Sequence, residues 1–147
     1  MALPSQFKKE NAQNIFIYHY VEEMIASYGI YLKDVFDESE LTRKEVPFLL
    51  RIRFSENTTQ KELVELFKVS EGYTAKLLRK FEDLGYIERH ENPANRRIKI
   101  VELTPSGIEK TDEIIDMVSN WEENVTSNLT DDEVVTLKKL LFKVVLV

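Results

Sequence analysis

Residues 92–107, NPANRRIKIVELTPSG, place two adjacent arginines on a short turn between two strand-like runs. In the runs 86–91 and 97–103, apolar residues alternate with charged ones, which is typical of half-exposed strands. Pro93 and Asn95 between the runs indicate a turn. The sequence therefore predicts a two-stranded hairpin with Arg96 and Arg97 at its tip.

An amphipathic helix with a basic outer surface is predicted directly before this hairpin. Ser70 can cap its N-terminus, and Gly85 can end it in the left-handed conformation. Its apolar side is formed by Thr74, Leu77, Leu78, Phe81 and Leu84. The outward positions are then Glu71, Tyr73, Lys76, Arg79 and Lys80.

A further helix is predicted over residues 59–67, where Thr59 and Glu62 have the spacing of a capping box. With the basic helix it has the length and spacing of a helix-turn-helix, whose second helix enters the major groove of DNA. Adding the hairpin gives a winged helix-turn-helix. The candidate DNA-binding residues are Ser70, Glu71, Tyr73, Lys76, Arg79, Lys80, Arg96 and Arg97.

Two alternatives to DNA contact remain open for these residues. A basic helix face can simply be solvated. In the hairpin, Arg97 can pair with Glu91 or Glu88 and hold the turn together.

Helices are also predicted on both sides of this region. Apolar residues at spacings of three and four indicate a long helix over about 11–36. A capping-box pattern at Thr42 and Glu45 predicts a second helix that runs to about Phe54. Thr104 and Pro105 begin a helix to about residue 127, and a last helix begins at Thr130. The fold class is therefore mainly α with a small β-hairpin.

Charge is unevenly distributed along the 147 residues, whose net charge is -6. Residues 57–100 carry net +2, whereas residues 1–56 carry -2 and residues 101–147 carry -6. An acidic protein can still bind DNA if its basic face meets the duplex. Since no apolar run approaches the roughly 20 residues of a spanning helix, we expect a soluble protein. The first residues, MALPSQFKKENAQN, lack the apolar core of an export signal, so we expect it in the cytoplasm.

Residues able to support catalysis or metal binding are few. The chain has no cysteine, which excludes disulfides and thiolate metal sites. The only histidines, His19 and His90, are far apart, and no glycine-rich phosphate loop is present. We expect neither an enzyme nor a cofactor.

The order of the helices, Leu41-Thr42, the segment TQKELVELFKVS and the segment NPANRRIKIVELTPSG together resemble the MarR/SlyA family of transcriptional regulators. Pro93, Arg97, Leu103, Thr104 and Gly107 fit the wing pattern of that family. Asn95 stands where an aspartate is usual, and Asn92 replaces the preceding acid. An asparagine offers Arg97 only a neutral hydrogen bond.

The resemblance implies a homodimeric repressor that binds a pseudo-palindromic operator in double-stranded DNA. Residues 1–38 and 105–147 would form the dimerisation helices, and residues 39–104 the DNA-binding lobe. The terminal helix supports a dimer because it is too apolar to leave exposed: it carries Leu137, Leu140, Leu141, Val144, Val145, Leu146 and Val147. The alternative is that it packs only within its own subunit.

The resemblance also implies a small aromatic or phenolic effector. Candidate lining residues are Tyr28, Tyr31, Phe36, Phe48 and Arg51, which combine aromatic surface with a cation. Their alternative role is ordinary core packing. A rival function for the whole chain is a winged-helix protein-interaction module that does not read DNA, suggested by the net charge of -6 and by Glu71.

Overall fold

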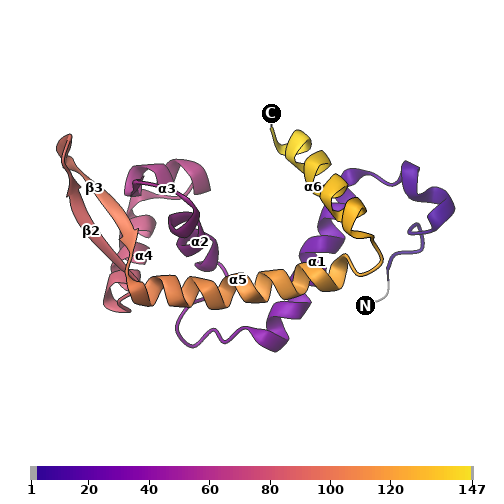
Figure 1. Ribbon diagram of the computed structural model, residues 1–147, viewed down its shortest axis with the longest axis horizontal. Coiled ribbons are helices and arrows are strands. Elements are labelled where there is room, and N and C mark those ends of the chain that lie inside the picture. The colour runs from indigo at the N-terminus through magenta and orange to yellow at the C-terminus, as the bar shows by residue number, and fades with distance from the viewer. Residues whose placement is uncertain (1–2, 147) are drawn as a thin grey trace. The chain divides into compact units, whose positions relative to one another are not determined.

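The computed structural model describes residues 3–146 and consists of helices with one small antiparallel sheet (Figure 1). In chain order the elements are η1 (Lys9–Asn14), α1 (Ile17–Val35), α2 (Val46–Phe54), β1 (Thr58–Thr59), α3 (Gln60–Phe67), α4 (Glu71–Asp83), β2 (Ile87–Asn92), β3 (Asn95–Leu103), α5 (Pro105–Val125) and α6 (Asp131–Val145). This composition confirms the predicted fold class.

The chain forms two compact units. The central unit runs from Asp37 to Met117, and the terminal unit combines the residues up to Phe36 with those from Val118 onward. In the C-terminal half the two units meet within α5, between Met117 and Val118, whereas the division by role that the sequence predicts, at 104/105, stays a prediction. Val147 of the predicted apolar terminus lies outside the described residues.

The sheet of the central unit has three strands in the order β1-β3-β2, one more than the predicted hairpin. The hairpin strands β2 and β3 pair from Ile87 with Leu103 to Asn92 with Asn95. The additional strand β1 pairs Thr58 with Val101 on the other edge of β3. With only two residues, β1 is too short to show the alternation by which a strand is recognised in a sequence.

The core of the central unit contains the apolar side of α4 that the sequence predicts. Leu77, Leu78 and Phe81 are buried, as is Thr74. The same unit also buries side chains from its other segments: Leu41, Leu49, Leu63, Val101 and Ile114. Burial of aliphatic and aromatic side chains supplies most of the stabilisation of such a lobe.

The predicted caps of the DNA-binding segment are present. Thr59 and Glu62 form both bonds of a capping box, and the Ser70 hydroxyl accepts a hydrogen bond from the Tyr73 amide at 3.1 Å. Gly85 has φ +78° and follows the last turn of α4. The Tyr86 amide donates to the Phe81 carbonyl at 2.9 Å, so the end of α4 is a Schellman motif.

The second helix begins later than the sequence predicts. Thr42 and Glu45 form a turn, and α2 starts at Val46. The Glu45 carboxylate still accepts from the Thr42 amide at 2.9 Å, which is half of a capping box. An earlier start is prevented by Pro47, because a proline ring inside a helix clashes with the carbonyl four residues before it.

The first predicted helix is divided. The 3-10 helix η1 ends at Asn14, Ile15 and Phe16 are extended, and α1 starts at Ile17. The extended segment allows the Ile15 side chain to be buried. In a continuous helix, rotation about the helix axis would point this side chain in another direction. Apolar spacing alone does not reveal such a break.

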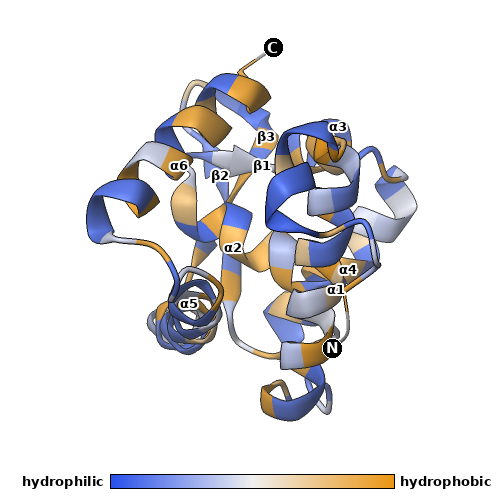
Figure 2. Ribbon diagram, turned by 90° about the vertical axis from the view of Figure 1, so that its right-hand side faces the viewer, coloured by the Kyte–Doolittle hydropathy of each residue, from blue (hydrophilic) through white to orange (hydrophobic). Residues whose placement is uncertain are grey.

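The terminal unit buries few of its apolar side chains. Among its described residues the buried apolar ones are Ile15 and Leu32. On α1, Ile25 is 66% exposed, and on α6, Phe142 is 61% and Val145 is 75% exposed. Figure 2 shows the hydrophobic stretches on the ribbon of α6. The unit therefore presents two helices with uncovered apolar faces.

Aromatic contacts join the segments of the terminal unit. The Trp121 ring of α5 lies edge-on to Tyr28 of α1, with centroids 5.1 Å apart, and its indole N–H donates to the Ser27 hydroxyl at 3.3 Å. Lys138 of α6 pairs with Glu122 of α5.

None of the helices within residues 3–146 combines the length and the apolar character that a membrane span requires.

Candidate nucleic-acid interface

The outward face of α4 carries the side chains that the sequence predicts for it. Glu71, Tyr73, Lys76 and Arg79 lie on this face, and all four are exposed. Neither Lys76 nor Arg79 forms an ion pair or side-chain hydrogen bond with any residue from 3 to 146. Their cationic groups are therefore available to phosphate oxygens or base edges.

Lys80 differs from these neighbours because its ammonium group is already paired. It lies 2.7 Å from Oε2 of Glu45, at the start of α2. Burial raises the pKa of the Glu45 carboxyl, but the bonds from Lys80 and from the Thr42 amide outweigh it and hold the pKa below its usual value. Lys80 thus links α4 to the start of α2.

Ser70 also has a structural role. Its hydroxyl oxygen accepts the Tyr73 amide hydrogen as the N-cap of α4. Since a capping hydroxyl keeps its own proton, Ser70 can donate one further hydrogen bond from the exposed start of the helix.

The tip of the hairpin is held by its two asparagines. Asn92 accepts a hydrogen bond from the Ala94 amide at 3.0 Å, and Asn95 accepts one from the Arg97 amide at 3.1 Å. Asn95 therefore holds the backbone of Arg97, although it provides no charge for the guanidinium group.

Arg96 and Arg97 are exposed, but they lie in the first residues of β3, next to the Pro93-Ala94 turn, and not on the turn itself as the sequence predicts. In the described part of the chain, Arg97 forms no ion pair with Glu91 or Glu88, which was the alternative to DNA contact. Arg97 borders a hollow together with Lys99 and Arg89 on the hairpin and with Glu71 at the start of α4. The hairpin and the start of α4 thus border one concave surface.

An ion pair that no sequence pattern indicates connects the hairpin to α4. Nε of Arg89 lies 2.6 Å from Oε1 of Glu82, and its Nη2 lies 2.9 Å from Oε2. This two-bond contact raises the pKa of Arg89 and lowers the pKa of Glu82. The two residues belong to different elements, so neither helical nor strand spacing indicates the pair.

The base of the hairpin is fastened to the first turn of α5. The Thr104 hydroxyl donates to the Gly85 carbonyl at 2.5 Å and accepts from the Gly107 amide at 3.0 Å. A Cβ atom at Gly107 would lie 2.0 Å from the Tyr86 carbonyl oxygen. Only glycine allows this approach, which explains why the Leu-Thr-x-x-Gly pattern follows the hairpin.

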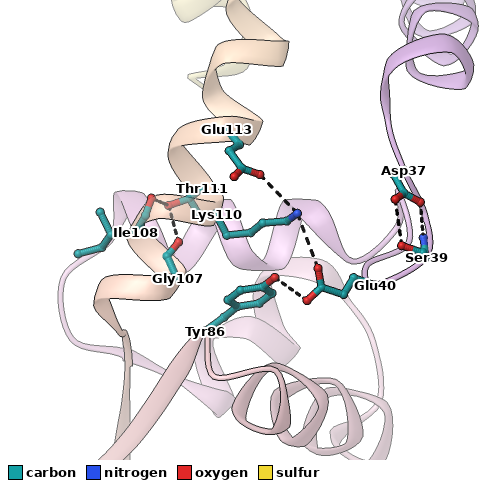
Figure 3. Close-up of polar contacts among 9 residues, drawn as sticks. All are labelled: Asp37, Ser39, Glu40, Tyr86, Gly107, Ile108, Lys110, Thr111 and Glu113. Atoms are coloured by element: carbon teal, nitrogen blue, oxygen red, sulfur yellow. Dashed lines mark hydrogen bonds and ion pairs between the residues drawn. The ribbon is translucent and has the colours of Figure 1, made fainter.

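A polar cluster surrounds the same junction (Figure 3). The Tyr86 hydroxyl donates to the Glu40 carboxylate at 2.7 Å. Lys110 of α5 lies 3.9 Å from Glu40 and 3.5 Å from Glu113. Burial of the Tyr86 hydroxyl, together with its bond to Glu40, raises the pKa of Tyr86 to about 12.

Arg53 attaches α2 to α5 on another side of the central unit. Its guanidinium donates to the Ile108 carbonyl at 3.0 Å and to the buried Thr111 hydroxyl at 2.9 Å. It also pairs with Asp112 at 2.9 Å. Arg89 and Arg53 are thus cations with internal partners, in contrast to those at the hairpin tip.

The five candidate effector residues are divided between the two units. In the central unit, Phe48 is buried and stacks on Phe67 with centroids 4.0 Å apart, and Arg51 borders a hollow beside Thr58 and Glu62. The other three belong to the terminal unit and are Tyr28, Tyr31 and Phe36. In the described chain no cluster of three or more side chains could hold a metal ion.

Comparison with known proteins gives consistent matches. The family model described as "MarR family" matches residues 41–99. The multiple antibiotic resistance protein MarR of Escherichia coli K12 is 31% identical over 114 residues, which cover 77% of this chain and 79% of that protein.

Solved structures agree with this match. A crystal structure of MarR superposes with a TM-score of 0.73 at 30% identity and covers 88% of both chains. A mutant MarR from E. coli complexed with operator DNA has a TM-score of 0.61 and 28% identity, covering 88% of this chain and 90% of that one.

Proposed function

This chain belongs to the MarR family of transcriptional regulators, and from that premise we propose that it is a homodimeric repressor of a pseudo-palindromic operator. Winged-helix architecture and DNA binding are properties it shares with its relatives. Dimerisation, repression and release by an effector are the proposed steps.

The proposal rests on a group of cations on α4 and the hairpin of the central unit. Among the described residues, these cations have no ion-pair partner. Lys76 and Arg79 project from α4, and Arg96 and Arg97 from the hairpin tip. We assign the helix cations to the major groove and the arginines to the narrow minor groove or its phosphates. Ser70, Glu71 and Tyr73 complete the proposed contact at the helix start.

Lys80 takes a different place in the proposal. Because its ammonium is 2.7 Å from Glu45, DNA contact would require that pair to break. We therefore assign Lys80 to orientation of α4 and expect little loss of DNA affinity that is specific to its charge.

The apolar faces of α1 and α6 support the proposed dimer. Exposed side chains such as Ile25, Leu140 and Val145 would remain in water in a single chain. Large apolar surfaces of this kind mark interaction sites. Pairing of both chain ends in two subunits would cover them and place two α4 helices about one helical turn of DNA apart.

The protein would repress transcription by occupying a promoter, and it would catalyse no reaction. We propose that an aromatic or phenolic effector, with Tyr28, Tyr31, Phe36, Phe48 and Arg51 as candidate contacts, favours a spacing of the two lobes that does not match DNA. Such a ligand can shift the equilibrium only by its difference in affinity for the two arrangements. The protein would work where the DNA is, in the cytoplasm.

The test uses operator DNA selected by the wild-type protein from genomic fragments. Arg97→Ala is expected to weaken binding about tenfold, and to lower the salt slope by about 0.9 for each phosphate that it no longer neutralises. Lys33→Ala, which removes a cation from the terminal unit, is the control and is expected to keep the wild-type slope.

The rival function, protein interaction without DNA reading, predicts a different result. In that case the selection recovers no common site, and neither Arg97→Ala nor a change of salt alters binding to the recovered fragments.

A further inference from the structure

The contact between Glu82 and Arg89 carries an inference beyond DNA binding itself. We propose that these two residues are positioning residues that set the angle between the wing and α4, and thereby where Arg96 and Arg97 reach. The inference rests on the proposed contact of the wing tip with DNA.

The geometry of the pair suits a positioning role. Two hydrogen bonds, at 2.6 and 2.9 Å, connect the last turn of α4 with the centre of β2. The side chains are only 26% and 32% exposed, so solvent screens them less than a pair at the surface. A fork of two parallel bonds also fixes the relative orientation of the planar groups, which a single bond does not.

The pair is located where control of the angle matters. The base of the hairpin is anchored in the core by Ile87, Ile100 and Val101, which are all buried. Arg89 pairs with Val101 in the register of the sheet. From Val101 the strand continues to Arg97 at the tip, which therefore lies roughly 13 Å beyond this point at about 3.3 Å per residue.

Beyond the pair, the outer part of the hairpin has little support. Residues 95–99 are all exposed. Among the described residues, the bonds from Arg89 to Glu82 are the outermost hydrogen bonds between the hairpin and α4. A small rotation at Arg89 is therefore magnified at the tip, where the distance to Lys76 and Arg79 determines whether both grooves can be occupied together.

Because of the charges around Glu82, a positioning role and a purely electrostatic role predict opposite effects of removing its carboxylate. The bond from Arg89 is the largest cause that lowers the pKa of Glu82, burial opposes it, and Arg79 and Lys99 add their positive charges. The carboxylate thus lies among three cations of α4 and the hairpin. If only charge mattered, its removal would strengthen binding to DNA, because it would unmask those cations.

The opposite sign is expected from a positioning role. Glu82→Gln keeps the shape of the side chain but loses the charged fork, so the wing tip samples more orientations. We expect operator affinity to fall about fivefold at fixed salt, the effect of losing one charge-assisted hydrogen bond. Glu88→Gln is the matched control, since Glu88 is an exposed carboxylate on the same strand as Arg89. It should bind as tightly as the wild type or more tightly.

A double-mutant cycle tests whether Glu82 acts through the tip. In a chain with Arg96→Ala and Arg97→Ala, Glu82→Gln should cause no further loss of affinity, because the wing then has nothing to position. Arg89→Lys, which keeps the cation but not the fork, should lie between Glu82→Gln and the wild type. Circular dichroism and thermal midpoints establish that each variant is folded.

Each outcome decides one question. If Glu82→Gln binds as tightly as the wild type or more tightly, or if its loss of affinity persists in the chain without tip arginines, the positioning role is wrong. If removal of both tip arginines leaves affinity unchanged, the proposed wing contact itself is wrong, whatever Glu82→Gln does.

Discussion

The two units of this chain treat their apolar side chains in opposite ways. The central unit buries them: Leu49, Leu63 and Phe81 are inaccessible to solvent. The terminal unit exposes them, with Ile25 and Val145 among the most accessible. The central unit thus has a buried core of its own, although Phe54 stays 70% exposed there, whereas the terminal unit leaves most of its large apolar side chains uncovered. In the proposed dimer, the central unit would bind DNA and the terminal unit would hold the two chains together.

Polar contacts divide the cations of the central unit into two groups. Arg53, Lys80 and Arg89 use their charges inside the central unit, and each connects two of its elements. The cations of the proposed DNA contact, Lys76, Arg79, Arg96 and Arg97, have no ion-pair partner among the described residues. Separate cations therefore serve folding and proposed binding.

The largest expected effect comes from placing a charge on the apolar face of α6. Leu140→Glu should prevent the proposed pairing of chain ends, because a carboxylate cannot be buried there without a partner. Operator affinity should fall by about 100-fold or more, since the second lobe no longer benefits from being tethered. Light scattering for mass, with operator titration, measures both effects.

The control for this change is Lys139→Glu, which adds a carboxylate at the adjacent exposed position of α6. It should leave the mass at that of two chains. If Leu140→Glu also keeps this mass and its affinity, the exposed face of α6 is not the assembly surface.

A second change tests the packing of the central unit. Gly107→Ala would place a Cβ atom 2.0 Å from the Tyr86 carbonyl oxygen, a backbone atom that cannot rotate away. We expect a loss of about 3 kcal/mol in the free energy of unfolding, at the upper end for overpacking. Urea denaturation measures it.

Gly72→Ala is the matched control, because a Cβ atom there meets nothing within 4 Å. Alanine should raise helix stability by up to about 1 kcal/mol at such a site. Equal losses for the two variants would mean that the close approach at Gly107 is not the cause.

The sequence predicts α4 and its surroundings well because several independent signals coincide there. The spacing of Leu77, Leu78 and Phe81, the cap at Ser70 and the stop at Gly85 all indicate the same helix, and all are confirmed. The wing tip at Arg96 and Arg97 is predicted by a turn between two alternating runs.

Contacts between distant elements could not be predicted in this way. Glu45 and Lys80 are 35 positions apart, and no local pattern relates them. For this reason the sequence assigns Lys80 to DNA, while the structure places its ammonium on Glu45. The Thr42 pattern failed for another reason, since a turn and a helix start share the same residue preferences.

This difference between caps gives a third, smaller effect. Thr59→Ala removes one bond of a complete capping box and should lower the free energy of unfolding by about 1 kcal/mol. Thr42→Ala should change it much less, because the Thr42 side chain does not cap α2. Thermal unfolding of both variants measures these losses of stability. Equal losses would mean that Thr59 does not stabilise α3 as a cap.

The smallest effect at neutral pH is expected from Tyr86→Phe, about 0.5 kcal/mol for one partly exposed hydrogen bond. Since the pKa of Tyr86 is raised from 10.0 to about 12, its contribution is complete below pH 10 and is lost as the pH rises through 12. Absorbance at the tyrosinate band should lose a step near pH 12 in the variant. An unchanged titration would mean that the hydroxyl is not held by Glu40.

The stoichiometry of the complex with selected operator DNA tests the central claim most directly. Sedimentation equilibrium of the wild-type protein with one duplex should give two chains bound to inverted half-sites about one helical turn apart. One chain bound to a single asymmetric site, at concentrations where binding is saturated, would contradict the account that the exposed chain ends pair to present two packed lobes.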